Sequence, residues 1–133
     1  MSGPQAGERP LDLASRWVLE SGIQSPCGGF HAWFDLGAGR YSFLYPEITG
    51  YGITALIFLS GLRRDRSIIE RAMRAGEWIL SAALHPCGGV RTRLYGEDET
   101  PDPFYSFSSG NIFSFDTAMR SEERRVGKEC RSR

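Results

Sequence analysis

The sequence predicts an all-α fold: an α/α toroid, in which helical hairpins form a ring, with short β-hairpin insertions. The first observation is an internal repeat, because a Trp-bearing helix precedes a Pro-Cys-Gly-Gly turn twice. Trp17 and Trp78 are 61 residues apart, and the turns 26–29 and 86–89 are 60 residues apart. The second observation is that residues 49–62 are apolar on nearly every face, a pattern typical of a buried helix. One repeat unit cannot bury its apolar face alone, whereas stacked units can.

The first unit begins with a helix and a hairpin. Residues 1–10 are polar, with Gly and Pro, and predict a disordered N-terminus. Residues 11–22 carry apolar side chains at helical spacing and end at a glycine, so they predict an outer helix. The aromatic runs 31–35 and 40–45 flank the sequence Leu-Gly-Ala-Gly and predict a β-hairpin.

Two helices are predicted after the hairpin. The buried helix 49–62 is followed by several arginines, which are favourable at a helix C-terminus. Ser67 and Glu70 then fit a capping box, in which each side chain accepts a hydrogen bond from a backbone N–H. The amphipathic helix that starts there leads to the second Gly-Gly turn and, from residue 91, to a second hairpin.

The predicted toroid is incomplete, because residues 11–119 contain only two units, about 11–65 and 66–119. Residues 120–133 read RSEERRVGKECRSR, which resembles the translation of a sequencing-library adapter read in frame. We therefore interpret them as a non-native tail, and they hold the single lysine of the chain, Lys128. The formal net charge of zero then arises from a basic tail added to residues that carry 10 basic and 13 acidic side chains.

Composition excludes several classes of protein. The neutral charge balance argues against a basic face that binds nucleic acid. The longest apolar stretch, 53–59, is too short to span a bilayer, and no signal-peptide pattern opens the chain. We therefore expect a cytoplasmic protein that neither binds nucleic acid nor spans a membrane.

Several motifs carry a family resemblance. Residues 24–30, Gln-Ser-Pro-Cys-Gly-Gly-Phe, resemble the Gln…Asp-Gly-Gly-Phe repeat of protein prenyltransferases and terpenoid cyclases, with Cys27 where Asp is usual. Residues 45–51, Tyr-Pro-Glu-Ile-Thr-Gly-Tyr, and 115–118, Phe-Asp-Thr-Ala, resemble the openings of inner helices in bacterial toroid proteins of the six-hairpin-glycosidase type. This resemblance implies a toroid linked to polysaccharide metabolism.

Glu47 and Asp116 are the candidate catalytic residues. In a toroid the N-terminal ends of the inner helices line the mouth of a central cavity, and each carboxylate stands at such an end. Two carboxylates on neighbouring helices suit acid and base roles in glycoside chemistry. The competing interpretation is that each carboxylate only caps its own helix.

Candidate substrate-binding residues surround these carboxylates. Aromatic rings stack on sugars or apolar substrates, histidine titrates near neutrality, and arginine pairs with a uronate or phosphate. The competing interpretations are that the aromatic residues pack the hairpin onto the helices and that the arginines form a solvated face. The candidates are His31, Trp33, Tyr41, Tyr45, Tyr51, Arg91 and Arg93.

We expect no metal and no cofactor. Cys27 and His31, with Cys87 and His85, are residue types that bind zinc, but their spacings match no zinc signature. Small side chains beside Gly-Gly turns explain the two cysteines more simply.

The sequence therefore predicts a carbohydrate-active protein, similar to a glycosidase or an epimerase, that acts on a sugar or another small-molecule substrate. One alternative is an enzyme that resembles terpenoid cyclases and prenyltransferases, and another is a non-catalytic glycan-binding helical repeat. Because the ring is incomplete, we expect the fragment to be inactive. We also expect helix 49–62 to expose an apolar flank, which favours association.

Overall fold

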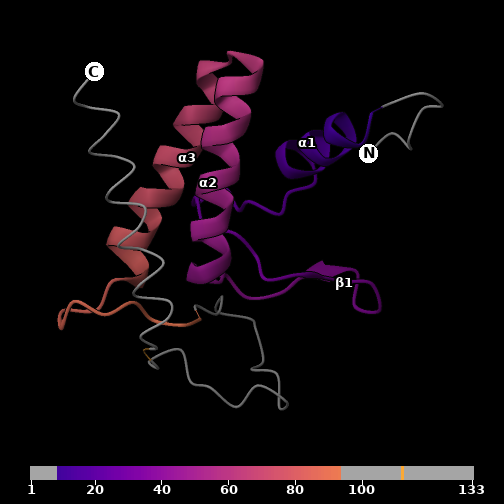
Figure 1. The fold of residues 1–133 in the computed structure, drawn as a ribbon. Coiled ribbons are helices and arrows are strands. Elements are labelled where there is room, and N and C mark those ends of the chain that lie inside the picture. The colour runs from indigo at the N-terminus through magenta and orange to yellow at the C-terminus, as the bar shows by residue number, and fades with distance from the viewer. Residues whose placement is uncertain (1–8, 94–111, 113–133) are drawn as a thin grey trace, which may run out of the picture.

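The computed structural model describes residues 9–93 and residue 112 (Figure 1). Its helices are α1 (Pro10–Glu20), α2 (Pro46–Arg63) and α3 (Arg66–Trp78), and α3 continues into a π-helical turn, η1 (Ile79–Ala83). Strands β1 (Phe34–Asp35) and β2 (Arg40–Tyr41) pair antiparallel, with Phe34 opposite Tyr41. Figure 1 shows α2 and α3 side by side, with α1 and the hairpin on one side of this pair. The predicted hairpin is thus confirmed.

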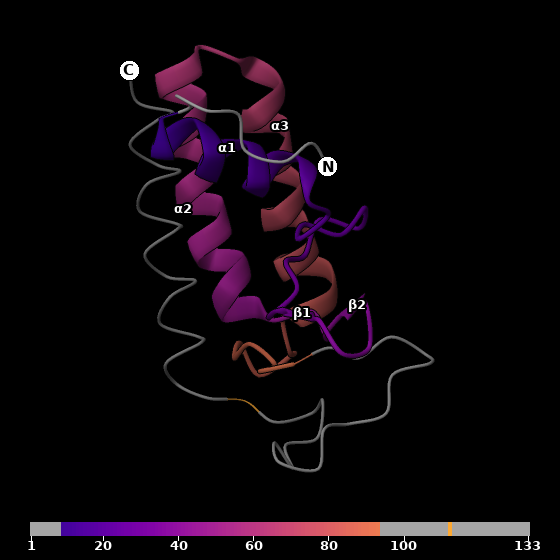
Figure 2. The ribbon, with the colours of Figure 1, turned by 90° about the vertical axis from the view of Figure 1, so that its right-hand side faces the viewer.

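The predicted α/α toroid is wrong. The described part of the chain forms three helices, one π-helical turn and one two-stranded sheet, and these do not make a ring of repeated hairpins. Figure 2 shows α1 lying across the α2–α3 pair, whereas a repeated outer helix would run alongside it. The sequence repeat reflects two similar turns, and a turn specifies the path of its own backbone rather than the packing of distant helices.

The two turns, residues 24–30 and 84–90, have the same backbone hydrogen bonds. In the first turn the N–H of Ser25 donates to the carbonyl of Gly29 at 2.8 Å, and the second turn repeats this bond 60 residues later at 2.8 Å. The first glycine of each pair has a left-handed φ, +110° and +90°, which favours glycine. The repeated sequence therefore encodes a repeated local conformation.

The surroundings of the two turns differ. A Cβ added to Gly28 would lie 2.4 Å from the backbone carbonyl oxygen of Arg74, so the first turn presses directly on α3. A Cβ added to the next glycine, Gly29, would lie 2.7 Å from the indole of Trp78. At Gly88, in contrast, an added Cβ would have no atom of the described residues within 4 Å, and one at Gly89 would meet the side chain of Ile112. Only the first turn is packed against a helix in this way.

A polar network reinforces the contact between the first turn and α3. The Nε of Arg71 donates to Oε1 of Gln24 at 2.9 Å, and Nη1 of Arg71 donates to the carbonyl of Leu19 at 2.6 Å. Nε2 of Gln24 donates to the carbonyls of Gly28 and Arg71, both at 3.0 Å. Burial and the nearby charge of Arg74 lower the pKa of Arg71. The network joins the end of α1, the turn and α3.

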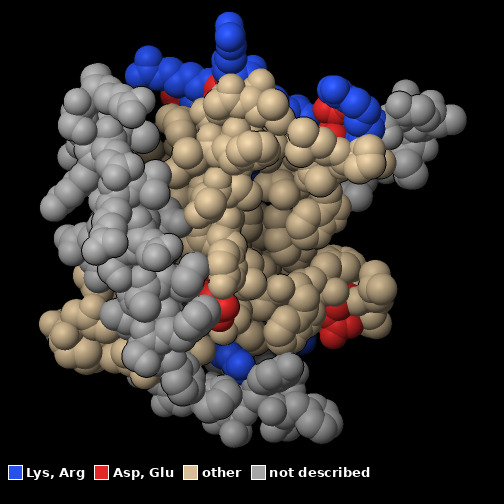
Figure 3. All heavy atoms as spheres, viewed as in Figure 1, with Lys and Arg blue, Asp and Glu red and all other residues tan. Residues whose placement is uncertain are grey.

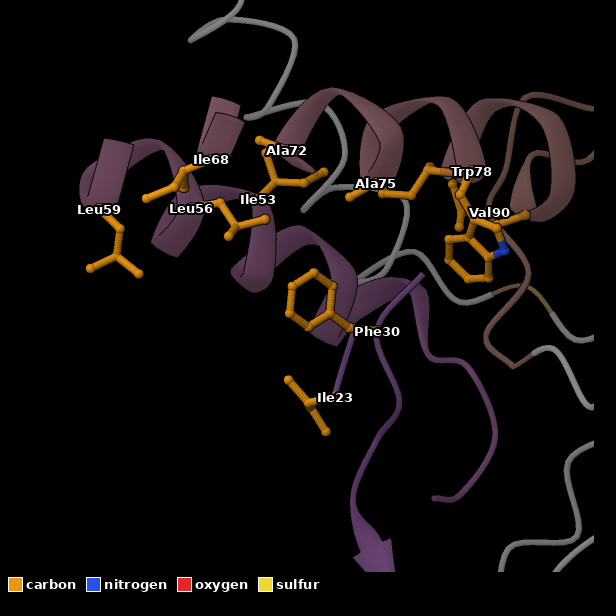
Figure 4. Packing of buried hydrophobic residues seen from close by; sticks show 12 residues of the cluster. Ile23, Phe30, Ile53, Leu56, Leu59, Ile68, Ala72, Ala75, Trp78 and Val90 are labelled. Atoms are coloured by element: carbon orange, nitrogen blue, oxygen red, sulfur yellow. The ribbon is translucent and has the colours of Figure 1, made fainter. Parts of the chain in front are cut away.

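The hydrophobic core lies between α2, α3 and the first turn. Figure 4 shows Phe30 against α2, with Ile23 beyond it, and Leu56 and Ala75 on the facing sides of the helix pair. The Phe30 ring occupies the space that a Cβ on Gly52 would need. The buried cluster comprises Ile23, Phe30, Ile53, Leu56, Leu59, Ile68, Ala72, Ala75, Trp78, Ile79, Ala83 and Val90.

The start of α3 differs from the predicted capping box. The N-cap is Asp65, whose Oδ1 accepts hydrogen bonds from the N–H of Ser67 at 2.9 Å and from its hydroxyl at 2.7 Å. Asp is among the strongest N-cap residues, so it displaces the start of the helix to Arg66. Ser67 therefore donates to the cap instead of providing it.

The Asp65 cap predicts an acid-sensitive contribution to stability. The hydrogen bonds from Ser67, and then the charge of Arg63, lower the pKa of Asp65 below its ordinary value of 3.8. Because the folded-state pKa is depressed, the contribution is complete above 3.8 and is lost as pH falls through the folded-state pKa. We expect Asp65→Asn to flatten this acid limb in urea unfolding at pH values on either side of 3.8. An unchanged acid limb would contradict the assignment.

Candidate functional site

Thr49 holds the N-terminal end of α2 against the first turn. Its Oγ1 accepts a hydrogen bond from the N–H of Phe30 at 2.9 Å and donates to the carbonyl of Tyr45 at 2.9 Å. The N–H of Tyr45 in turn donates to the carbonyl of Phe30 at 2.9 Å. Thr49 is fully buried, so these bonds are shielded from water. The sequence interpretation missed this positioning role, whose only signal is a hydroxyl at the start of an apolar helix.

Glu47 lies in the first turn of α2 beside Tyr45. The helix begins at Pro46, three residues before the predicted start, because proline already has the φ of a first helical residue. The hydroxyl of Tyr45 donates to Oε2 of Glu47 at 2.6 Å. The positive end of the helix dipole also favours a carboxylate here. The phenol and the dipole together fix a half-buried carboxylate at the end of α2.

Aromatic rings and one arginine gather around Phe43, next to this carboxylate. Trp33 meets Phe43 edge to face at a centroid distance of 5.2 Å, and Tyr45 does so at 5.9 Å. The guanidinium carbon of Arg93 lies 4.7 Å from the centre of the Phe43 ring, which is a cation–π contact. Phe43 and Arg93 are buried, whereas Trp33 is 38% exposed. We call Trp33, Phe43, Tyr45, Glu47 and Arg93 the Glu47 site.

His31 and Tyr41 form a second group, which secures the hairpin. Their rings stack at a centroid distance of 4.9 Å, and the hydroxyl of Tyr41 donates to the carbonyl of Ser21 at the end of α1. Nδ1 of His31 lies 2.6 Å from the carbonyl of Ser42. Since a carbonyl only accepts, Nδ1 carries the proton, and Nε2 is the nitrogen left for another partner. Tyr41 thus joins the hairpin to the end of α1.

The two candidate arginines have different surroundings. Nη1 of Arg91 donates to the carbonyl of Ala82 at 3.2 Å, at the end of η1. Arg93 instead lies in the Glu47 site. Between them, Thr92 is 2% exposed, and its Oγ1 has no hydrogen-bond partner among the described residues. The sequence offered no signal for this buried hydroxyl.

The remaining candidates lie apart from the Glu47 site or outside the described residues. Tyr51 follows Glu47 by one helical turn and is 45% exposed on α2. Asp116, the second predicted catalytic carboxylate, lies outside the described residues, as do the hairpin beyond residue 93 and the segment 120–133. The pairing of two carboxylates therefore stays a prediction.

The cysteines lie on the two turns as exposed thiols. Sγ of Cys27 donates to Oγ of Ser25 at 3.2 Å, and the N–H of Cys87 donates to Nδ1 of His85 at 3.2 Å. Within residues 9–93 and at 112, no three His, Cys, Asp or Glu side chains gather closely enough to hold a metal ion.

Comparison of the chain with family models, curated proteins and solved structures found no match. Among the helices that the structure describes, none combines the length and the apolar character needed to cross a membrane.

Proposed function

We propose that the chain binds carbohydrate at the Glu47 site. The observation that carries the proposal is the hydrogen bond of 2.6 Å between Tyr45 and Glu47. It holds a carboxylate at the end of a series of aromatic contacts that leads through Phe43 to the partly exposed Trp33. A carboxylate accepts hydrogen bonds from sugar hydroxyls, and an aromatic face stacks on the C–H surface of a sugar ring.

Glycan processing is the catalytic form of the same proposal. Glu47 would act as the general acid or base, and Asp116 would supply the second carboxylate that glycoside chemistry needs. Retaining enzymes place the two carboxyl groups about 5 Å apart and inverting enzymes about 6.5–9.5 Å apart. Sugar binding requires only the residues of the Glu47 site, whereas catalysis would also require Asp116. The contacts within the Glu47 site therefore support binding more directly than catalysis.

We also propose that the protein is located in the cytoplasm. Cys27 and Cys87 are free, exposed thiols, which is the state that a reducing compartment maintains.

The proposal predicts that Glu47→Gln weakens sugar binding with little change in Tm. Loss of the charge removes charge-assisted hydrogen bonds to sugar hydroxyls, which corresponds to a Kd increase of roughly ten- to a hundredfold. Titration calorimetry with neutral and uronic-acid oligosaccharides would measure it. Glu77→Gln is the matched control, because Glu77 is exposed on α3 and lies outside the site. A large drop in Tm with unchanged binding would show that Glu47 only supports the helix.

A further inference from the structure

Tyr51 presents a half-exposed aromatic ring one helical turn beyond the Glu47 site. It follows Glu47 by four residues on α2, and side chains at this spacing are neighbours on a helix surface, with Cβ atoms about 5–6 Å apart. Tyr51 is 45% exposed. The hydroxyl of Tyr45 is bonded to Glu47, whereas that of Tyr51 has no hydrogen-bond partner in the described part of the chain. Tyr51 therefore offers both a ring face and a hydroxyl to a ligand.

Trp33 is the other partly exposed ring connected with the Glu47 carboxylate. Its ring contacts Phe43 at 5.2 Å, and Phe43 contacts Tyr45 at 5.9 Å, so two ring contacts separate Trp33 from the tyrosine that bonds Glu47. In this series of neighbours the carboxylate comes between Trp33 at one end and Tyr51 at the other. Figure 3 shows acidic atoms at the molecular surface near the N-terminal end of α2, where Glu47 lies.

We propose, on the basis of the carbohydrate binding proposed above, that the ligand of the Glu47 site is an oligosaccharide. One sugar residue stacks on Trp33 and another on Tyr51, and Glu47 accepts hydrogen bonds from hydroxyls near the linkage between them. A single sugar ring stacks on only one of two aromatic rings that are not in contact, so the use of both rings requires at least two linked residues. Tyr51 then determines the preference for longer ligands.

Phe58 provides the matched control for Tyr51. It is also an aromatic residue of α2, and it is 60% exposed. It lies seven residues beyond Tyr51, about 10 Å further from the Glu47 site along the helix. Alanine is a strong helix former, so both positions accept it without loss of the helix, and Tm measurements check this.

Calorimetric titration of the full chain tests the proposal with two series of sugars: glucose with cellobiose and cellotetraose, and galacturonic acid with its dimer and tetramer. We expect the oligomers of one series to bind at least tenfold more tightly than their monosaccharide. Tyr51→Ala should weaken oligomer binding roughly three- to tenfold and leave the Kd of the monosaccharide unchanged. Phe58→Ala should change neither.

The outcomes separate the ligand size from the binding itself. If Glu47→Gln weakens sugar binding but monosaccharides and oligomers bind equally well, the oligosaccharide site is overturned and carbohydrate binding stands. Equal effects of Tyr51→Ala and Phe58→Ala, or an equal loss for the monosaccharide and the oligomers in Tyr51→Ala, would also overturn it. Absence of saturable binding for every sugar would contradict the proposed function and the oligosaccharide site with it.

Discussion

Gly28→Ala should destabilise the fold by about 3 kcal/mol, the largest loss that we expect from any single methyl group in this chain. The added Cβ would lie 2.4 Å from the carbonyl oxygen of Arg74, a backbone atom within α3 that cannot rotate away. The φ of +110° adds the cost of a left-handed conformation for a residue with a side chain. Both costs arise in the folded state only, so equilibrium unfolding in urea measures their sum.

The second turn offers the matched control. Gly88 has a φ of +90°, yet an added Cβ there would meet no atom within 4 Å among residues 9–93 and residue 112. Gly88→Ala should therefore cost only the conformational term, about 1–2 kcal/mol. The difference between the two variants isolates the contact of the first turn with α3. Equal losses at both glycines would show that this contact does not contribute to stability.

Gln24→Leu should cost about 1–3 kcal/mol, because it leaves the half-buried guanidinium of Arg71 and the carbonyl of Gly28 without the amide. Leucine is the residue at the equivalent position of the second turn, Leu84, so the side chain suits the local backbone. The expected loss of stability is thus caused by the missing hydrogen bonds rather than by a changed backbone conformation of the turn. Urea unfolding followed by far-UV circular dichroism would measure it.

A double-mutant cycle separates the network from its parts. Arg71→Met removes the charge that Gln24 satisfies, so the double variant should lose less stability than the two single variants together. Additive losses would contradict a direct coupling between Gln24 and Arg71.

The sequence was sufficient for most local structure. Apolar periodicity located α1 and α3, and the Leu-Gly-Ala-Gly segment located the hairpin, because these signals depend on residues close in the chain. The boundaries were less accurate, since Pro46 and Asp65 begin α2 and α3 earlier than the predicted positions. Pro46 acts through its fixed φ and Asp65 through its side-chain cap, and apolar periodicity reports neither.

The arrangement of the helices was not predictable from the repeat. Two turns with the same hydrogen bonds have different neighbours, because Gln24 receives the guanidinium of Arg71 and its equivalent is a leucine. Such long-range contacts decide where α1 lies, and the toroid prediction failed at this step.

Expected position and residue type together selected the candidate site residues. Trp33, Tyr45 and Arg93 meet around Phe43, and Glu47, which was selected for its place at a helix start, bonds to Tyr45. Tyr41 and Arg91 are residue types that can bind a sugar. The hydroxyl of Tyr41, however, donates to the carbonyl of Ser21 at the end of α1, and Nη1 of Arg91 donates to the carbonyl of Ala82 in η1. Residue type alone does not distinguish a side chain that binds a ligand from one that secures a loop.

The most direct test of the proposed carbohydrate site is a map of amide chemical shifts during titration of the full chain with oligosaccharides. We expect saturable changes centred on Trp33, Phe43, Tyr45 and Glu47, including the indole N–H of Trp33, and their loss in Glu47→Gln. Changes confined to α3, or no saturable change with either neutral or uronic-acid oligosaccharides, would contradict carbohydrate binding at this site.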